Sequence, residues 1–325
     1  MLTVPDAALY ALAMRWHFIP ATALLPAAAI LALLAWMPGS AAADPGVERE
    51  LRELTDRLAV TPADPRLLLA RAELSGRLGR FDDAQADLDL AEVSGGDRGR
   101  VDLLRAVTFA DAGRFEQAVR LLEGSVTLMA PRDRASAYAL LATLHERFDR
   151  IDDAVLAYDR ALELRPDVQL HLSRGRLLRG VGRVTEAIAG LEEGVIALAG
   201  AAVLRAQLIE IYLAAGMPRG AIGHAGVLIT SARAKSRWLL LRGQAYDLAG
   251  DPRRARIDRE AALADAERVL SRRGSATARL ARARALSALG RDAEARADLE
   301  RVVRRAPRNR EARALLHALR QGGAR

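Results

Sequence analysis

Few residues of this 325-residue chain could support catalysis or metal binding, since it has no cysteine and only five histidines. The histidines are His17, His145, His171, His224 and His317. His145-Glu146 begins like the helical zinc motif His-Glu-x-x-His, but Asp149 stands where the second histidine is needed. Zinc in proteins is held by three or four ligands, and one histidine without cysteine cannot supply them. We therefore expect His145 to be a packing residue.

Two other catalytic signatures are missing from the sequence. A P-loop requires Gly-Lys-Ser/Thr, and the only lysine, Lys235, is not preceded by glycine. No Gly-x-Ser-x-Gly nucleophile elbow occurs. The acidic pairs Asp82-Asp83 and Asp152-Asp153 are placed to open helices, where the helix dipole stabilises negative charge. The sequence therefore predicts no enzyme active site, no metal and no cofactor.

Arg176 and Arg179 have a spacing that could bind an anion. They lie one helical turn apart, and guanidinium groups bind carboxylate or phosphate through two parallel hydrogen bonds. The alternative is that both are solvated surface residues. The sequence leaves these two interpretations open.

These residues lie within a repeat that runs through most of the chain. The phrase Gly-Arg-Phe-Asp-Asp-Ala at 79–84 returns as Gly-Arg-Phe-Glu-Gln-Ala at 113–118 and in five further copies. The final alanines follow one another at steps of 34, 36, 33, 34, 34 and 40 residues. We call them the anchor alanines: Ala84, Ala118, Ala154, Ala187, Ala221, Ala255 and Ala295. Such a period indicates stacked helical repeats.

Each copy has the pattern of two helices joined by a tight turn. Twelve residues before the anchor alanine, six copies have Ala or Gly, which lets two helices approach closely. Five residues before it, six copies have Gly, which adopts positive φ at a helix end at little cost. Four residues after it, five copies have Leu or Tyr on the same helical face. With aromatic residues at only 4%, the composition also favours helices over a large sheet.

At these positions the chain resembles the tetratricopeptide repeat family. The match is close over Trp238–Ala255 and over Tyr138–Pro166, and the resemblance extends from about Pro65 to Pro307. It implies an all-α fold, a right-handed α-solenoid of about seven helix-turn-helix repeats. A leading helix is expected at Val47–Leu58, within a segment 44–64 that precedes the array at 65–307. A capping helix is expected within 308–325.

Several positions depart from the family pattern. The fifth repeat has Ile209, Ala225 and Leu228 at normally patterned positions, and the sixth has Arg259 where a core residue is expected. The 40-residue step implies either a longer second helix or a loop around Ser271–Ser275. In the capping helix, Ala314, Leu315 and Leu319 are expected to cover the last repeat.

The resemblance also implies a concave groove lined by the first helix of each repeat. The candidate groove residues are Arg66, Glu73, Arg100, Thr143, Gln169, Arg176, Arg179, Gln207, Glu210, Gln244, Asp247 and Arg284. The family's clamp for C-terminal carboxylates uses paired Lys and Asn, which this groove lacks. The expected function is therefore a non-enzymatic scaffold that binds a segment of some other protein partner.

The N-terminal residues 1–43 predict export. The stretch 19–36 is apolar and uncharged, Arg15 precedes it, and Ala41-Ala42-Ala43 follows in the place of a cleavage site. A bacterial signal peptide explains this order, with a possible true start at Met14, and implies a periplasmic or secreted protein. The alternative is an inner-membrane anchor formed by residues 19–36, although eighteen apolar residues are borderline for spanning.

The net charge of +8 is unevenly distributed. Residues 44–165 carry 18 basic against 24 acidic side chains, whereas residues 233–325 carry 24 against 11. The basic C-terminal third supports an alternative function, the binding of an anionic envelope polymer or lipid. Nucleic acid is not expected as a partner, because an exported chain would not meet it and aromatic stacking platforms are scarce.

Overall fold

The computed structural model describes residues 45–322, and within them it contains helices and no strand. The predicted signal segment, with the apolar stretch 19–36 and His17, lies outside these residues. The chain divides into two compact units, Met1–Met129 and Ala130–Arg325, called unit 1 and unit 2 below. No helix within residues 45–322 combines the length and the apolar character needed to cross a membrane.

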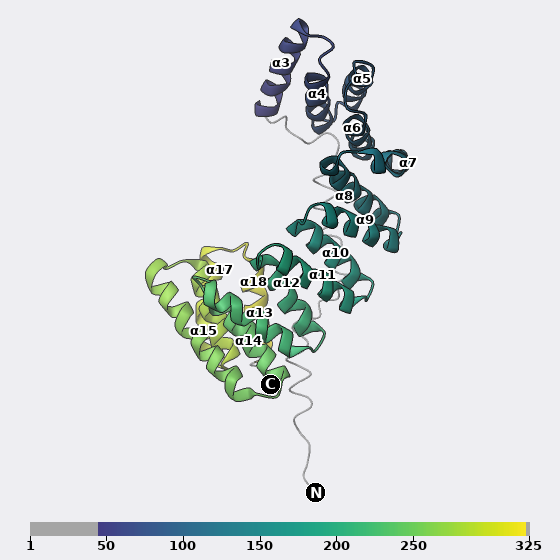
Figure 1. Cartoon of the computed structure of the whole chain (residues 1–325). Coiled ribbons are helices and arrows are strands. Elements are labelled where there is room, and N and C mark those ends of the chain that lie inside the picture. Colours follow the sequence, from purple (N-terminus) through teal and green to yellow (C-terminus); the bar gives the residue numbers. More distant parts are fainter. Residues whose placement is uncertain (1–44, 323–325) are drawn as a thin grey trace. The chain divides into compact units, whose positions relative to one another are not determined.

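Unit 1 has one leading helix and two helix pairs (Figure 1). Its elements are α3 (Pro45–Val60), α4 (Pro65–Arg77), α5 (Phe81–Val93), α6 (Arg98–Asp111), α7 (Phe115–Ser125) and the 3-10 turn η1 (Val126–Leu128). The leading helix expected at Val47–Leu58 runs over Pro45–Val60.

Unit 2 has five helix pairs followed by one last helix (Figure 1). Its elements are α8 (Pro131–Arg147), α9 (Ile151–Leu164), α10 (Val168–Gly180), α11 (Val184–Ala197), α12 (Ala202–Ala214), α13 (Pro218–Ser231), α14 (Ser236–Leu248), α15 (Pro252–Arg273), α16 (Ala276–Ala288), α17 (Asp292–Arg305) and α18 (Arg310–Gly322). The two units together hold seven helix-turn-helix pairs, so the expected all-α solenoid is confirmed.

The anchor alanines are the points of closest packing within each pair. All seven are completely buried, with 0% of their surface exposed. At Gly243, twelve positions before Ala255, an added Cβ would lie only 3.2 Å from the carbonyl oxygen of Ala255. At this crossing of α14 and α15, a residue larger than glycine would crowd the backbone of α15.

The turn between the two helices of a pair requires left-handed backbone. Glycine supplies it in six copies, as at Gly79 (φ 72°). The third copy has Asp149 at this position, and Asp149 adopts the same conformation with φ 57°. Aspartate tolerates this region better than most residues, so the turn is preserved without glycine.

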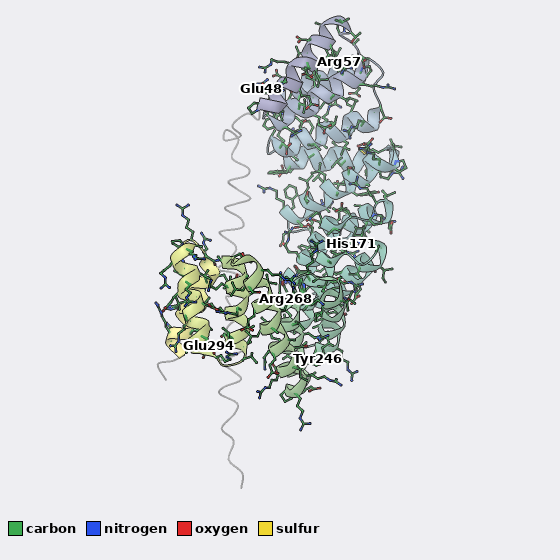
Figure 2. The ribbon with its side chains drawn as sticks, turned by 90° about the vertical axis from the view of Figure 1, so that its left-hand side faces the viewer. Glu48, Arg57, His171, Tyr246, Arg268 and Glu294 are labelled. Atoms are coloured by element: carbon green, nitrogen blue, oxygen red, sulfur yellow. The ribbon has the colours of Figure 1, made fainter. Side chains whose placement is uncertain are left out.

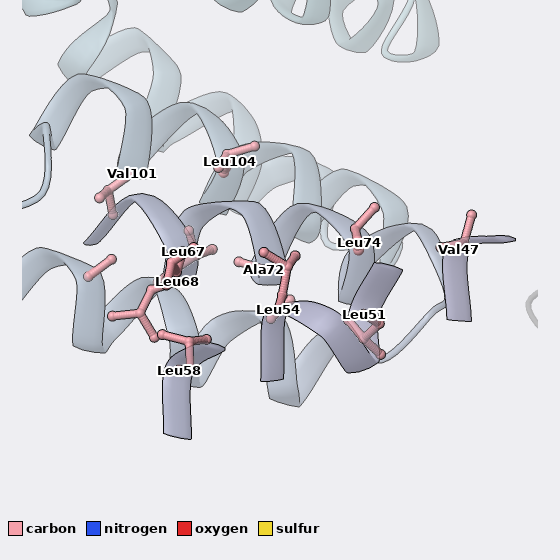
Figure 3. Close-up of a cluster of buried hydrophobic side chains, with 13 residues drawn as sticks. Val47, Leu51, Leu54, Leu58, Leu67, Leu68, Ala72, Leu74, Val101 and Leu104 are labelled. Carbon is pink, nitrogen blue, oxygen red and sulfur yellow. The ribbon is translucent and has the colours of Figure 1, made fainter. Parts of the chain in front are cut away.

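Each unit has its own hydrophobic core. In unit 1 the leading helix lays Leu51, Leu54 and Leu58 against Leu67 and Leu68 of α4 (Figure 3). These residues recur at three- and four-residue spacing, which places them on one face of α3. The leading helix therefore covers the apolar face of the first pair.

Helix α18 covers the apolar face of the seventh pair, with a buried stripe that differs from the expected one. Ala312, Leu316 and Leu319 are buried against α17, whereas Ala314 is exposed and Leu315 only partly buried. The spacing of four and three residues from Ala312 marks the buried face, and Ala314 points away from it.

The structure also resolves the departures from the repeat pattern. The 40-residue step is a longer second helix, because α15 has 22 residues and ends at Gly274 with φ 58°. Arg259 does not enter the core, since its guanidinium forms an ion pair with Asp247. Ile209, Ala225 and Leu228 form the buried cluster of the fifth pair.

Candidate interaction surface

The first helices of successive pairs lie side by side within each unit. Helix α4 contacts α6 in unit 1, and α10, α12, α14 and α16 contact one another in order in unit 2. We call the exposed residues of these helices the first-helix surface. The candidate groove residues all belong to first helices, so their side chains are compared below within each unit.

In unit 1 two of the three candidates bind each other. Arg100 of α6 donates to Glu73 of α4 at 3.0 Å. Arg66 is exposed near the start of α4, where Asp64 caps the helix by accepting from its backbone N–H. The charges of Glu73 and Arg100 therefore stabilise the stacking of two first helices.

The same arrangement recurs in unit 2. Arg237 of α14 donates to Glu210 of α12 at 2.9 Å, and Arg284 of α16 pairs with Glu311 of α18. In each case the partners are 27 residues apart, as Glu73 and Arg100 are. Each pair joins a first helix to the next one or, for Arg284, to α18, and sequence reasoning missed these contacts although the 27-residue spacing was visible. These residues are largely occupied with one another.

Partial burial shifts the pKa of two candidates, Asp247 and the already paired Arg284. Burial raises the pKa of Asp247 against the opposing effect of Arg259. Burial, followed by the nearby charge of Arg237, lowers the pKa of Arg284. A partner's charge would have to compete with contacts already present at both positions.

Arg176 and Arg179 differ from the other charged candidates of unit 2. Both are exposed on α10, and neither forms an ion pair with a carboxylate of residues 45–322. Arg176 makes only a long contact of 3.4 Å to the hydroxyl oxygen of Ser173. The sequence singled out this pair, and the structure leaves both guanidinium groups open to solvent.

The remaining candidates present uncharged polar groups. Thr143 of α8 donates its hydroxyl to the carbonyl of Leu140 in its own helix at 2.8 Å. Gln169 and Gln244 are exposed, and Gln207 is half-buried. Amides of this kind can donate and accept, so they suit a peptide backbone.

A second set of arginines is structural, and sequence reasoning missed it. Arg71, Arg242 and Arg282 lie thirteen residues before an anchor alanine, and each binds the aspartate sixteen residues later. The acceptors Asp87, Asp258 and Asp298 are buried, with contacts of 2.6–2.8 Å through two nitrogens of each guanidinium. The recurrent spacing was the available signal. These bidentate pairs join the two helices of a repeat.

The histidines of unit 2 serve packing and internal hydrogen bonds. His145 is buried, and it occupies the slot filled by tyrosine in other copies. His171, labelled in Figure 2, bonds through Nδ1 to the carbonyl oxygen of Gly190 at 2.9 Å. Burial lowers the pKa of His171, so the ring is neutral at pH 7. Within the described residues, no three His, Asp or Glu side chains lie close enough to hold a metal.

One polar network links three helices in unit 2. Glu192 of α11 accepts from the hydroxyl of Tyr212 at 2.9 Å and bonds to Nε2 of His224 at 2.8 Å. Arg205 lies 3.2 Å from the other ring nitrogen of His224. Burial and the neighbouring Glu192 raise the pKa of Tyr212 to about 12, so this phenol keeps its proton. The network acts as a polar connection between repeats.

Comparison with known families decides the identity of the repeat. Two tetratricopeptide repeat models match the chain, over residues 139–202 and 276–309. The chain contains tetratricopeptide repeats. The first matched segment contains Arg176 and Arg179, so the proposed anion-binding pair sits within a recognised repeat. No curated protein sequence matches this chain.

One solved structure shows the same fold, and a second is similar at a lower score. The C-terminal part of a tetratricopeptide repeat-containing protein from Cytophaga hutchinsonii aligns at a TM-score of 0.53 and 13% identity, over 76% of this chain and 99% of that one. A tetratricopeptide repeat protein from Parabacteroides merdae aligns at 0.41 and 17% identity, over 66% and 85%. Tetratricopeptide repeats are interaction modules, and the family is generally non-catalytic, so this chain has the architecture of a protein-interaction scaffold.

Proposed function

We propose that this protein is a non-enzymatic scaffold of the bacterial cell envelope that binds an acidic segment of a partner protein on its first-helix surface. Arg176 and Arg179 carry the proposal. Other charged candidates of unit 2 are paired within the chain, whereas these two are exposed and lack a carboxylate partner. A partner's carboxylates would supply the missing acceptors through charge-assisted hydrogen bonds.

The surrounding side chains support a peptide as the bound segment. Gln169 lies on the same helix as the two arginines, and Gln207 lies on the adjacent helix α12. Their amides can bond to an extended backbone while the arginines select acidic side chains or a C-terminus. Binding of this kind needs no chemical step, which agrees with a chain that lacks a catalytic motif.

The envelope location rests on the N-terminal sequence. Residues 1–43 have the charge, apolar stretch and small-residue site of a signal peptide. We propose that cleavage after Ala43 releases the repeats to the periplasm or medium. Retention of residues 19–36 as an inner-membrane anchor is the alternative, and the mass of the protein isolated from cells distinguishes the two.

The test is affinity capture from an envelope fraction with residues 44–325, comparing the unaltered sequence with R176E/R179E. The expected result is that one or two proteins survive a moderate-salt wash on the unaltered chain and are lost on the variant. R219E/R253E is the matched control, because Arg219 and Arg253 are also exposed arginines of unit 2 without an ion pair. Circular dichroism should show equal helicity for all three proteins.

Two results would overturn the proposal. If the captured proteins bind R176E/R179E as strongly as the unaltered chain, the pair is not the binding site. If both double variants lose the captured proteins equally, net charge rather than this position governs retention.

A further inference from the structure

An arginine-lined hollow lies between α16 and α17, the two helices of the seventh pair. Its volume is about 390 Å³, and it is lined by Arg279 of α16 with Arg301, Arg304 and Arg305 of α17. Helix α17 belongs to the yellow end of the ribbon in Figure 1. Among the residues that the structure describes, these four arginines are its lining, and we call it the arginine hollow.

Three acidic residues nearby in sequence, Asp298, Glu300 and Glu294, form ion pairs with arginines outside the hollow. Asp298 is held by Arg282 at 2.7 Å and reaches Arg279 only at 3.5 Å. Glu300 binds Arg320 at 3.1 Å, and Glu294 binds Arg291 at 2.7 Å. Arg301, Arg304 and Arg305 are exposed and form no ion pair with a residue of 45–322.

Helix electrostatics explain only part of this arrangement. Arg304 and Arg305 lie in the last turn of α17, where the helix dipole favours positive charge. Arg279 lies in the first turn of α16, where the dipole disfavours it, and Arg301 is too far from the end of α17 to benefit. Four guanidinium groups around one hollow also repel one another. A bound anion would relieve both costs.

We propose that the arginine hollow binds a compact polyanion, namely a group with two or more linked phosphates. Guanidinium forks match phosphate oxygens, and four of them exceed what a single carboxylate can satisfy. A volume of about 390 Å³ is larger than one phosphate group needs. The described lining offers guanidinium groups as its polar donors, so the phosphate groups are what this site would recognise.

This site is separate from the proposed protein-binding pair. The arginine hollow is formed by α16 and α17, whereas Arg176 and Arg179 belong to α10. The proposal also narrows the alternative function predicted for the basic residues 233–325. It assigns anion binding to four of these arginines instead of to the net charge of the whole segment. The same phosphate chemistry occurs in a soluble oligophosphate and in a lipid headgroup, and the experiment separates these sources.

The experiment uses residues 44–325, which contain every helix described above, and isothermal titration with sodium tripolyphosphate. The unaltered chain is expected to bind with one site, and R301Q/R304Q at least tenfold more weakly. R219Q/R253Q removes the same charge from exposed arginines elsewhere in unit 2 and should stay within twofold of the unaltered chain. The single variant R305Q provides a second test if the double variant does not fold.

A vesicle arm identifies the source. Co-sedimentation with cardiolipin vesicles, lost in R301Q/R304Q and absent with phosphatidylcholine, would support the hollow as a site for a lipid headgroup. Tripolyphosphate binding without such sedimentation would support a soluble ligand. Absence of both, or equal affinity in the unaltered chain and in R301Q/R304Q, would overturn the proposal. None of these results depends on Arg176 or Arg179, so the two proposals fail separately.

Discussion

At the scale of single residues, the arginines of this protein divide into structural and solvent-facing groups. Arg71, Arg242 and Arg282 each bind a buried aspartate through two nitrogens. Such pairs cost desolvation, but removal of one partner leaves the other charge without its contact. High arginine content therefore does not by itself indicate a binding surface.

The pair in the seventh repeat gives a direct test. D298A should lower the free energy of unfolding by about 1–3 kcal/mol, because it strips a half-buried guanidinium of its bidentate acceptor. The measurement is urea denaturation followed by circular dichroism. R282M/D298L is the control, since replacing both partners by apolar residues should recover most of the loss. Equal destabilisation by both variants would contradict this account.

His171 makes stability depend on pH. Burial lowers its pKa in the folded chain, while the unfolded chain takes up the proton near the ordinary value of about 6.5. The unfolded state therefore binds more protons as pH falls, and stability should decrease between about pH 7 and pH 5. Thermal unfolding of H171N, which can still donate to Gly190, should show a smaller decrease over this range. An unchanged pH dependence in H171N would exclude His171 as the source.

At the scale of the element, each helix pair is fixed by a close crossing and a turn. Ala154 is completely buried where α9 crosses α8, and Tyr158 one turn later is also buried. The hydroxyl of Tyr158 donates to Glu146 of α8, and burial raises the pKa of this phenol. The alanine sets the distance between the two helices, and the larger residues around it depend on that distance.

Enlargement of the anchor should therefore destabilise the pair. A154L is expected to cost about 1–3 kcal/mol, because the added carbons have no space at the crossing. Chemical denaturation measures the loss. L156A is the control, since Leu156 lies on the exposed face of the same helix and its loss should change stability little. If A154L is as stable as L156A, the crossing is looser than the burial indicates.

At the scale of the whole molecule, the repeats form two units with separate cores. The core of unit 1 includes the leading helix, and the cores of unit 2 extend to the capping helix. A solenoid buries its apolar faces between neighbouring pairs, so each run of pairs can hold its own structure. Net charge differs along the chain as well, with the basic excess confined to residues after 233.

Separate production of residues 44–129 and 130–325 tests this division. Both pieces should be soluble and helical, because each contains a complete hydrophobic cluster. Circular dichroism and thermal unfolding of each piece are the measurements. A piece cut within a pair, such as residues 149–325, is the control and should be less stable, since α9 would lose α8. Failure of either natural piece to fold would show that the units are interdependent.

The repeats could be predicted from the order of the amino acids alone. The contacts that define a repeat all form within one helix pair. The spacing of the anchor alanine, of the small residue before it and of the turn residue, such as Gly79 or Asp149, can therefore be read from the sequence of one copy. Repetition of that spacing then indicated the all-α solenoid, its family and the first helices that carry Arg176 and Arg179. The leading and capping helices followed from their apolar spacing, although the buried stripe of α18 was misplaced.

Which charged side chains remain unpaired depends on the packed positions of the helices. Glu210 and Arg237 are 27 residues apart, and their pairing depends on how neighbouring first helices are aligned. Arg259 bonds to Asp247 instead of entering the core because a long side chain can extend to a carboxylate on the adjacent helix. Arg279 and Arg301 line one hollow because α16 and α17 pack against each other. Contacts between helices require their packed positions, which a local sequence pattern does not specify.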